Sequence, residues 1–274
     1  MSTAVRPYHA VFRARFYLLL QYRAAALAGF GTQCWWGAVK VMVFAAFFRG
    51  ATSAPMTLRQ AIDYIWLAQA LLTLLPWSVD PDFARMVRSG DVAYDRLRPL
   101  DTYGYWYARA VARRTATPLL RAIPMVLTAG VLLPLLGIPE WGLSAPAGWS
   151  AAALFGTSLV LVVALAAAVA TLMEIVTVAA LSERGVNMIM GGIIIVFSGN
   201  LVPLPLLPDR FQRFLELQPF AGLMDTPLRI YSGHFAGTDA LLALGRQAIW
   251  VLVLVWIGRL LMRRVMARLQ AQGG

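Results

Sequence analysis

The run WSAAALFGTSLVLVVALAAAVATLM, residues 149–173, contains no charged side chain. A helix needs roughly 20 mostly apolar residues to cross a hydrocarbon layer of about 30 Å. Inside a bilayer the backbone must satisfy its own hydrogen bonds, so a run of this kind is expected to be helical. The sequence therefore predicts a membrane span that begins at Trp149 and ends at Met173 or continues to Leu181.

Five more apolar runs lie on either side of this one, at residues 24–48, 61–77, 117–136, 186–203 and 240–262. Of the 274 residues, 59% are hydrophobic and 14% are charged, whereas about a quarter of a typical soluble domain is charged. This apolar excess is too large for a single buried core. The sequence predicts an all-α integral membrane protein with six transmembrane helices, forming one domain over residues 1–274.

The charge pattern orients these spans. Net charge is +11, and Lys40 is the only lysine. A basic chain can bind nucleic acid, but here the arginines flank apolar runs, which favours a role in membrane topology and no nucleic-acid partner. If the N-terminus is cytoplasmic, sixteen arginines fall in cytoplasmic segments, and outside lie only Arg49, Arg59, Arg210, Arg213, Arg229 and Arg246. The positive-inside rule then predicts that both termini are cytoplasmic.

The single cysteine, Cys34, excludes an intrachain disulfide, and with two histidines it gives no metal-ligand pattern. Arg13, Arg15 and Arg23 precede an apolar run that is too long for a signal peptide. Aromatic and basic residues alternate here, which is typical of a helix lying in the membrane interface. We expect residues 1–23 to be a cytoplasmic interfacial arm. The alternative is the start of the first span, but one continuous helix would be too long for a single crossing.

A charged segment, RSGDVAYDRLRPLD at residues 88–101, holds six charged residues in fourteen. It lies in the longest predicted cytoplasmic loop, residues 78–116. Gly90 and Pro99 can end or start helices there. Tyr94, Leu97 and Leu100 are spaced by three, so on a helix they would form one apolar stripe among charges. This pattern is typical of a surface helix that docks into another protein, and the alternative is a solvated loop.

Two longer segments carry a resemblance. SGDVAYDRLRPLDTYGYWYAR, residues 89–109, is similar to the cytoplasmic loop of six-span ABC-type permeases of the type-2 exporter class. It resembles most a little-characterised branch with a Gly-acid-apolar-apolar-Tyr…Leu-Arg-Pro-Leu signature. FSGNLVPLPLLPDRFQRFLELQPFAGLMDTPLRIYSG, residues 197–233, resembles the run that follows span five in that family. Together they cover about a fifth of the chain, in the expected order.

The resemblance implies a membrane subunit of an ATP-driven exporter in the cytoplasmic (inner) membrane of a prokaryote, in contact with membrane lipids. A separate dimer of ATPase subunits would bind ATP and Mg and hydrolyse the ATP, so no cofactor is expected in this chain. The sequence agrees in lacking the G-x-x-x-x-G-K-[ST] phosphate loop. The permease would pair with a second copy or with a sister permease. The resemblance does not name a cargo.

In this family the cytoplasmic loop contacts the ATPase. The residues implied in coupling are Asp91, Tyr94, Asp95, Arg96, Arg98 and Pro99. A surface of mixed charge suits that role, because charge complementarity fixes register and partner choice.

The second segment predicts a broken structure. Pro203, Pro205 and Pro208 cannot continue a membrane helix. The run at residues 209–217 then predicts a short amphipathic helix, with Phe211, Phe214 and Leu215 on its apolar face. In related permeases this region, residues 204–239 here, forms re-entrant helices outside the cytoplasm, and the alternative is a loop lying flat on the membrane. The implied gate residues are Pro203, Pro208, Phe211, Phe214, Pro219 and Phe220.

Three charged residues, Lys40, Arg121 and Glu174, fall in or near the spans. Such residues are costly in a bilayer and often functional. Arg121 and Glu174 lie near cytoplasmic ends, where we expect them to snorkel or to pair with each other. Lys40 lies deeper and is a candidate for an interface or a substrate contact.

Two other function classes stay open. A membrane enzyme acting on lipid or glycan would need a catalytic cluster at one face, but His9 and His234 fall on opposite sides. An ion-coupled secondary transporter would show inverted repeats and paired carboxylates, and neither is visible. Only the exporter requires a cytoplasmic ATPase partner.

Overall fold

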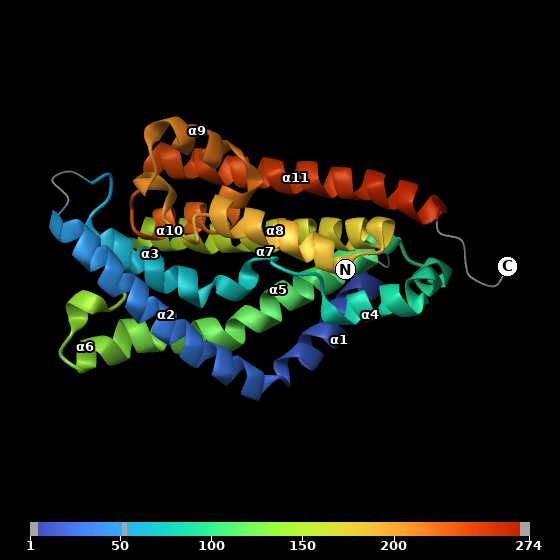
Figure 1. The fold of residues 1–274 in the computed structure, drawn as a ribbon, viewed down its shortest axis with the longest axis horizontal. Coiled ribbons are helices and arrows are strands. Elements are labelled where there is room, and N and C mark those ends of the chain that lie inside the picture. The colour runs from blue at the N-terminus through green and yellow to red at the C-terminus, as the bar shows by residue number, and fades with distance from the viewer. Residues whose placement is uncertain (1–4, 51–53, 269–274) are drawn as a thin grey trace.

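The computed structural model describes residues 5–50 and 54–268, and all regular structure in these residues is helical (Figure 1). The α-helices are α1 (Arg6–Leu20), α2 (Arg23–Gly50), α3 (Leu58–Ala70), α4 (Pro81–Ser89), α5 (Thr102–Leu127), α6 (Leu133–Leu135), α7 (Trp149–Ala180), α8 (Glu183–Phe197), α9 (Asp209–Leu217), α10 (Asp225–Tyr231) and α11 (Gly237–Arg268). The 3-10 helices are η1 (Leu72–Leu74), η2 (Asp91–Leu97), η4 (Pro139–Trp141), η5 (Leu204–Leu206) and η6 (Pro219–Leu223), and the π-helical turn η3 (Thr128–Leu132) joins α5 to α6.

Three helices in the described residues are long and apolar enough to cross a membrane. They are α5 continued through α6 (Thr102–Leu135), α7, and α11 from Gly237 to Ala267, with 34, 32 and 31 residues. They contain the runs predicted at residues 149–173 and 240–262, and the run predicted at 117–136 except for its last residue. The all-helical fold is therefore confirmed for the described residues, with three helices that are candidates for membrane spans.

Helix α7 is central to this bundle. In the most apolar stretch of 18 residues of each helix, 61% of the stretch is buried in α7, 17% in the α5–α6 helix and 28% in α11. Ala166, Ala167 and Ala168 are fully buried. Small side chains let neighbouring helices approach closely, and α7 packs against α5, α10 and α11.

The other three predicted spans are helical but differ in extent. Helix α2 covers residues 24–48, yet Gln33 and Lys40 make it less apolar. Over residues 61–77 the helix α3 ends at Ala70. Leu75 then adopts extended dihedrals (φ −63°, ψ 130°), because it precedes Pro76. Over residues 186–203 the helix α8 ends at Phe197, just before Gly199 with φ +81°. Six crossings remain a prediction.

The predicted arm is a separate helix. Helix α1 ends at Leu20, the chain turns at Gln21 and Tyr22, and α2 begins at Arg23. A continuous first span that includes the arm is thus wrong. Helix α1 packs along α5 instead. Residues 1–4 of the arm lie outside the described residues, and its place at the membrane interface stays a prediction.

The two ends of the molecule's long axis are formed by different elements (Figure 1). Helices α1 and α4 and the C-terminal end of α11 lie at one end of the long axis, here named the charged end. Helices α6 and α9 lie at the other, here named the proline-rich end. The predicted loop at residues 78–116 is itself largely helical: it comprises α4, η2 and the first half of α5.

Candidate functional sites at the two ends

Asp80 joins three helices at the charged end. As the N-cap of α4 it accepts a hydrogen bond from the backbone N–H of Asp82 at 2.9 Å. Its carboxylate also lies 2.8 Å from Arg15 Nη2 of α1 and 3.1 Å from Arg113 Nη1 of α5. Burial opposes ionisation, but Arg113 and Arg15 outweigh it and lower the pKa of Asp80 to about 2. The ionised carboxylate therefore holds α1, α4 and α5 together.

Two more contacts fix α1. Arg15 Nη1 lies 2.6 Å from Asp82 Oδ2. The hydroxyl of Tyr8 accepts a hydrogen bond from the backbone N–H of Asp101 at 3.3 Å. Since Asp101 is the N-cap of α5, these contacts tie α1 to the first turns of both α4 and α5.

Residues 90–98, here named the η2 segment, are anchored on α5 from one side. Gly90, with φ +82°, ends α4 in the left-handed conformation that glycine adopts without strain. Asp95 is buried and accepts hydrogen bonds from Trp106 Nε1 at 3.0 Å and Arg98 Nε at 2.9 Å. Phe83 packs edge-on against Trp106, with ring centroids 4.5 Å apart. The segment is thereby attached to α5.

The structure separates the predicted coupling residues into two groups. Asp95 faces inward, unlike the exposed charge that the sequence pattern predicts. The others lie at the surface, where Tyr94 is 67% exposed: Asp91, Tyr94, Arg96, Arg98 and Pro99.

The predicted apolar stripe is present in part. The structure has a 3-10 helix where the sequence predicts an α-helix. A 3-10 helix has three residues per turn, so Tyr94 and Leu97 still project on the same side. Leu97 is 79% exposed, whereas Leu100 lies beyond the helix and is half-buried. An anchored segment therefore presents two adjacent exposed apolar side chains.

The predicted gate residues lie at the proline-rich end. Pro203 is buried, Pro208 precedes α9, and Pro219 begins η6. Phe220 is half-buried, and its N–H donates to Gln218 Oε1 at 2.6 Å.

The apolar face predicted for α9 is split. Leu215 is buried, while Phe211 and Phe214 are 50% and 61% exposed. Phe214 still touches the ring of Phe197 edge-on, at 6.3 Å between centroids.

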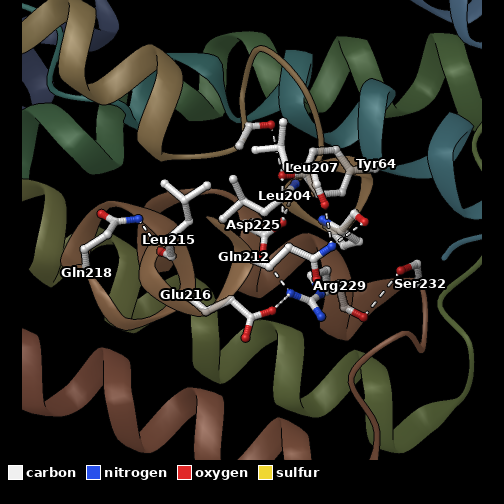
Figure 2. Close-up of polar contacts among 12 residues, drawn as sticks. Tyr64, Leu204, Leu207, Gln212, Leu215, Glu216, Gln218, Asp225, Arg229 and Ser232 are labelled. Atoms are coloured by element: carbon white, nitrogen blue, oxygen red, sulfur yellow. Dashed lines mark hydrogen bonds and ion pairs between the residues drawn. The ribbon is translucent and has the colours of Figure 1, made fainter. Parts of the chain in front are cut away.

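Figure 2 shows a polar network that ties this end together. Asp225 of α10 is 1% exposed and accepts hydrogen bonds from Tyr64 Oη at 3.2 Å and Leu204 N at 3.3 Å. Arg229 Nη1 lies 3.3 Å from Asp225 Oδ2 and 2.5 Å from Glu216 Oε1 of α9. The network thus connects α3, η5, α9 and α10.

Burial raises the pKa of Asp225 to about 6, although Arg229 and the hydrogen bonds from Tyr64 and Leu204 oppose the rise. The carboxyl group lies against the buried guanidinium of Arg229, and the two form an ion pair within α10. Sequence reasoning missed this network. The only local signal is the i,i+4 spacing of Asp225 and Arg229, which pairs opposite charges on a helix.

The three charged residues predicted within spans have separate partners. Lys40 Nζ donates to the backbone carbonyl of Asn200 at 2.8 Å, in the turn between α8 and η5. Arg121 Nη2 donates to the carbonyl of Ala25 at 3.4 Å. Glu174 is buried and interacts electrostatically with Asp80, Arg109, Arg113 and Arg114. Among the described residues, Arg121 and Glu174 form no ion pair with each other, so the predicted pairing is wrong.

Residues 5–50 and 54–268 contain no group of three or more His, Cys, Asp or Glu side chains that could hold a metal ion.

A comparison with protein families finds one match, which covers most of the chain. A family model described as "ABC-2 family transporter protein" matches residues 36–273. No match was found among the curated proteins or among the solved structures. The matched range includes the three long apolar helices, the η2 segment and the proline-rich end. It confirms the resemblance inferred from the sequence: this chain belongs to the ABC-2 transporter family, as an ABC-2 type permease.

Proposed function

We propose that this chain is the membrane-spanning subunit of an ATP-driven exporter in the cytoplasmic membrane of a prokaryote. In this proposal it crosses the membrane six times with both termini in the cytoplasm. It carries no ATPase site, and separate ATPase subunits bind ATP and Mg at the charged end. It works as a pair, with a second copy or a sister permease. The family supports transport and an ATPase partner, and the placement of α1 and the end of α11 at one end supports the orientation.

The observation that carries the proposal is the exposed pair Tyr94 and Leu97 on an anchored segment. The described part of the chain leaves most of these two side chains uncovered, since they are 67% and 79% exposed. Such a pair suits a contact with a separate protein, since aromatic and large apolar side chains anchor interfaces. The charged residues around the pair would fix the register.

The attachment of the η2 segment gives this contact a mechanical consequence. Asp95 and Phe83 both hold Trp106 of α5. Helix α5 is one of the three long apolar helices, and α1 is clamped to it through Asp80 and Tyr8. A force on the η2 segment would therefore move α1 and α5 together, which is how nucleotide-driven motion of an ATPase would reach the membrane.

At the proline-rich end we propose that η5 to α10 form the re-entrant region and close the pathway. The network of Tyr64, Asp225, Arg229 and Glu216 holds it in the arrangement seen here, and Lys40 caps the preceding turn. Opening would require these contacts to separate. Broken backbone is tolerated at such a depth because protein covers it.

A pull-down tests the proposal. The tagged chain is solubilised gently from native membranes, and its partners are identified by mass spectrometry. We expect a stoichiometric ATPase subunit with wild type, and at least tenfold less with Tyr94→Ser/Leu97→Ser. The control Leu135→Ser/Leu136→Ser makes the same kind of change at side chains that are 78% and 65% exposed at the other end, and should retain the ATPase. An absent ATPase with wild type would refute the exporter, and full retention by the first variant would refute this contact surface.

A further inference from the structure

A cavity of about 530 Å³ lies at the charged end, between the α1–α2 turn and α5. One part of its wall is apolar and includes Leu18, Leu19, Ala26 and Leu120. Another part is strongly basic and contains Arg15, Arg113, Arg114 and Arg121, against the carboxylates of Asp80 and Asp82. The cavity thus combines a cationic region with a hydrocarbon surface.

The two carboxylates that line the cavity pair with only some of its arginines. Asp80 pairs with Arg15 and Arg113, and Asp82 pairs with Arg15. Arg114 donates only to the carbonyls of Thr73 and Leu75, at 3.2 and 3.1 Å, and Arg121 only to the carbonyl of Ala25. Within residues 5–50 and 54–268 neither forms an ion pair. Glu174 of α7 interacts electrostatically with Arg114 but does not line the cavity.

Unsatisfied polar atoms gather on the same wall. Arg15 Nε, Arg114 Nε and Thr73 Oγ1 are buried and lack a hydrogen-bond partner in the described part of the chain. All three residues line the cavity, and Arg114 is only 5% exposed. Buried polar groups are nearly always hydrogen-bonded in native proteins. Three such groups beside one basic cavity show that this wall has more hydrogen-bond donors than acceptors, which suits an anionic group.

We propose that the cavity binds an anionic phospholipid, with its phosphate on the arginines and an acyl chain along the leucines of α1. Guanidinium groups bind phosphate oxygens in a bidentate manner, and basic pockets between membrane helices at the cytoplasmic face hold anionic headgroups. A free phosphate ion would leave the apolar wall and most of the volume unused. The lipid would lie between α1 and α2 and would fix the angle between these two helices. The inference rests on the membrane location in the proposed function, but requires no ATPase.

Two glycines of α2 provide a matched pair of variants. A Cβ at Gly29 would lie 2.3 Å from Arg121 Cζ and would push that guanidinium out of the cavity. The displaced group is the end of a flexible side chain, so the helix itself can remain unchanged. A Cβ at Gly31 meets no atom within 4 Å. Gly29→Ala therefore disturbs the site, and Gly31→Ala is its control.

The test measures binding to the purified full chain in neutral detergent, by native mass spectrometry and by the shift in melting temperature. The probes are phosphatidylglycerol, phosphatidylethanolamine, inorganic phosphate and glycerol 1-phosphate. We expect wild type and Gly31→Ala to retain phosphatidylglycerol and to melt several degrees higher with it. Gly29→Ala and Arg121→Gln should bind it at least tenfold more weakly. The two soluble phosphates should give no shift.

Three results would overturn the proposal. Equal binding of phosphatidylethanolamine would show that charge is not recognised. An equal shift with inorganic phosphate would show a phosphate site and no lipid site. Equal loss of binding in Gly29→Ala and Gly31→Ala would show that any change in α2 weakens binding, and that the position of Arg121 in the cavity does not matter. None of these outcomes depends on an ATPase copurifying with the chain, so the lipid site can fail while the exporter proposal stands.

Discussion

Replacing Asp80 by Asn should loosen the charged end by a predictable amount. Asparagine keeps the shape of the side chain and can still accept the N–H of Asp82 as an N-cap. The substitution therefore removes mainly the charge that faces Arg15 and Arg113, at 2.8 and 3.1 Å. These two arginines then lose the buried carboxylate they share.

The magnitude follows from the pKa of Asp80, which lies at about 2 against an ordinary 3.8. That difference corresponds to about 2–3 kcal/mol. Truncating one partner of a buried ion pair costs roughly 3–5 kcal/mol, so this value lies at the low end of the expected range. For a chain of 274 residues it corresponds to a melting temperature lower by about 4–5 °C.

The pH dependence has a definite sign. Because the pKa of Asp80 is depressed in the folded state, its stabilisation is fully present above pH 4 and is lost as pH falls towards 2. The difference in melting temperature between wild type and Asp80→Asn should be constant from pH 7 to 5 and should shrink below pH 4.

The assay is thermal unfolding of the purified chain in detergent, followed by the fluorescence of its nine tryptophans. Asp82→Asn is the control, because Asp82 is 40% exposed and exposed ion pairs contribute about 0–1 kcal/mol. A double-mutant cycle with Arg113→Gln should show that the two losses are not additive. Equal shifts for Asp80→Asn and Asp82→Asn, or a shift below 2 °C for Asp80→Asn, would refute the assignment of Asp80 as the junction of α1, α4 and α5.

Three further substitutions test other parts of the structure by the same unfolding assay or by hydrogen exchange. Gly199→Ala should lower the free energy of unfolding by about 2–4 kcal/mol, because φ is +81° and the new Cβ would lie 2.4 Å from Tyr64 Oη. In the control Gly192→Ala the new Cβ meets no atom within 4 Å, so this variant should not be destabilised. Equal effects of the two substitutions would contradict this geometry. Gln247→Leu removes buried hydrogen bonds of 2.8 and 2.7 Å that tie α11 to α7 and η6, and should cost about 2–3 kcal/mol; an unchanged melting temperature would count against it. Asp95→Ala should raise amide exchange in the η2 segment at least tenfold while α7 stays protected, and uniform protection would show that Asp95 is no anchor.

Much of the fold could be predicted from sequence because it depends on local rules. The charge-free run at residues 149–173 is part of one long helix, and Gly90 ends α4 as expected. The separate arm followed from length alone, since one helix from Tyr8 to Phe48 would far exceed a single crossing. The role of Asp80 was also within reach, because Asp followed by Pro is a helix N-cap with proline at the first helical position.

The remaining features depend on contacts that no single sequence displays. Tyr64 and Asp225 are 161 positions apart, and neither carries a motif that names the other. Asp95 turns inward because Trp106 offers it a donor from the next helix, whereas its charged neighbours predicted an exposed side chain. Lys40 was assigned to an interface or a substrate, but its partner is a main-chain carbonyl in a turn whose position only the fold determines.

The most direct measurement is cross-linking from the η2 segment in native membranes. Tyr94→p-benzoylphenylalanine places a photo-reactive group at the charged end, at a side chain that is 67% exposed. Phe211→p-benzoylphenylalanine places the same group at the proline-rich end, at a side chain that is 50% exposed. After irradiation, adducts are identified by mass spectrometry. The proposed function predicts an adduct from position 94 to an ATPase subunit with a phosphate-binding loop, and none from position 211. An ATPase adduct from position 211 only, or no ATPase adduct from either position, would contradict it.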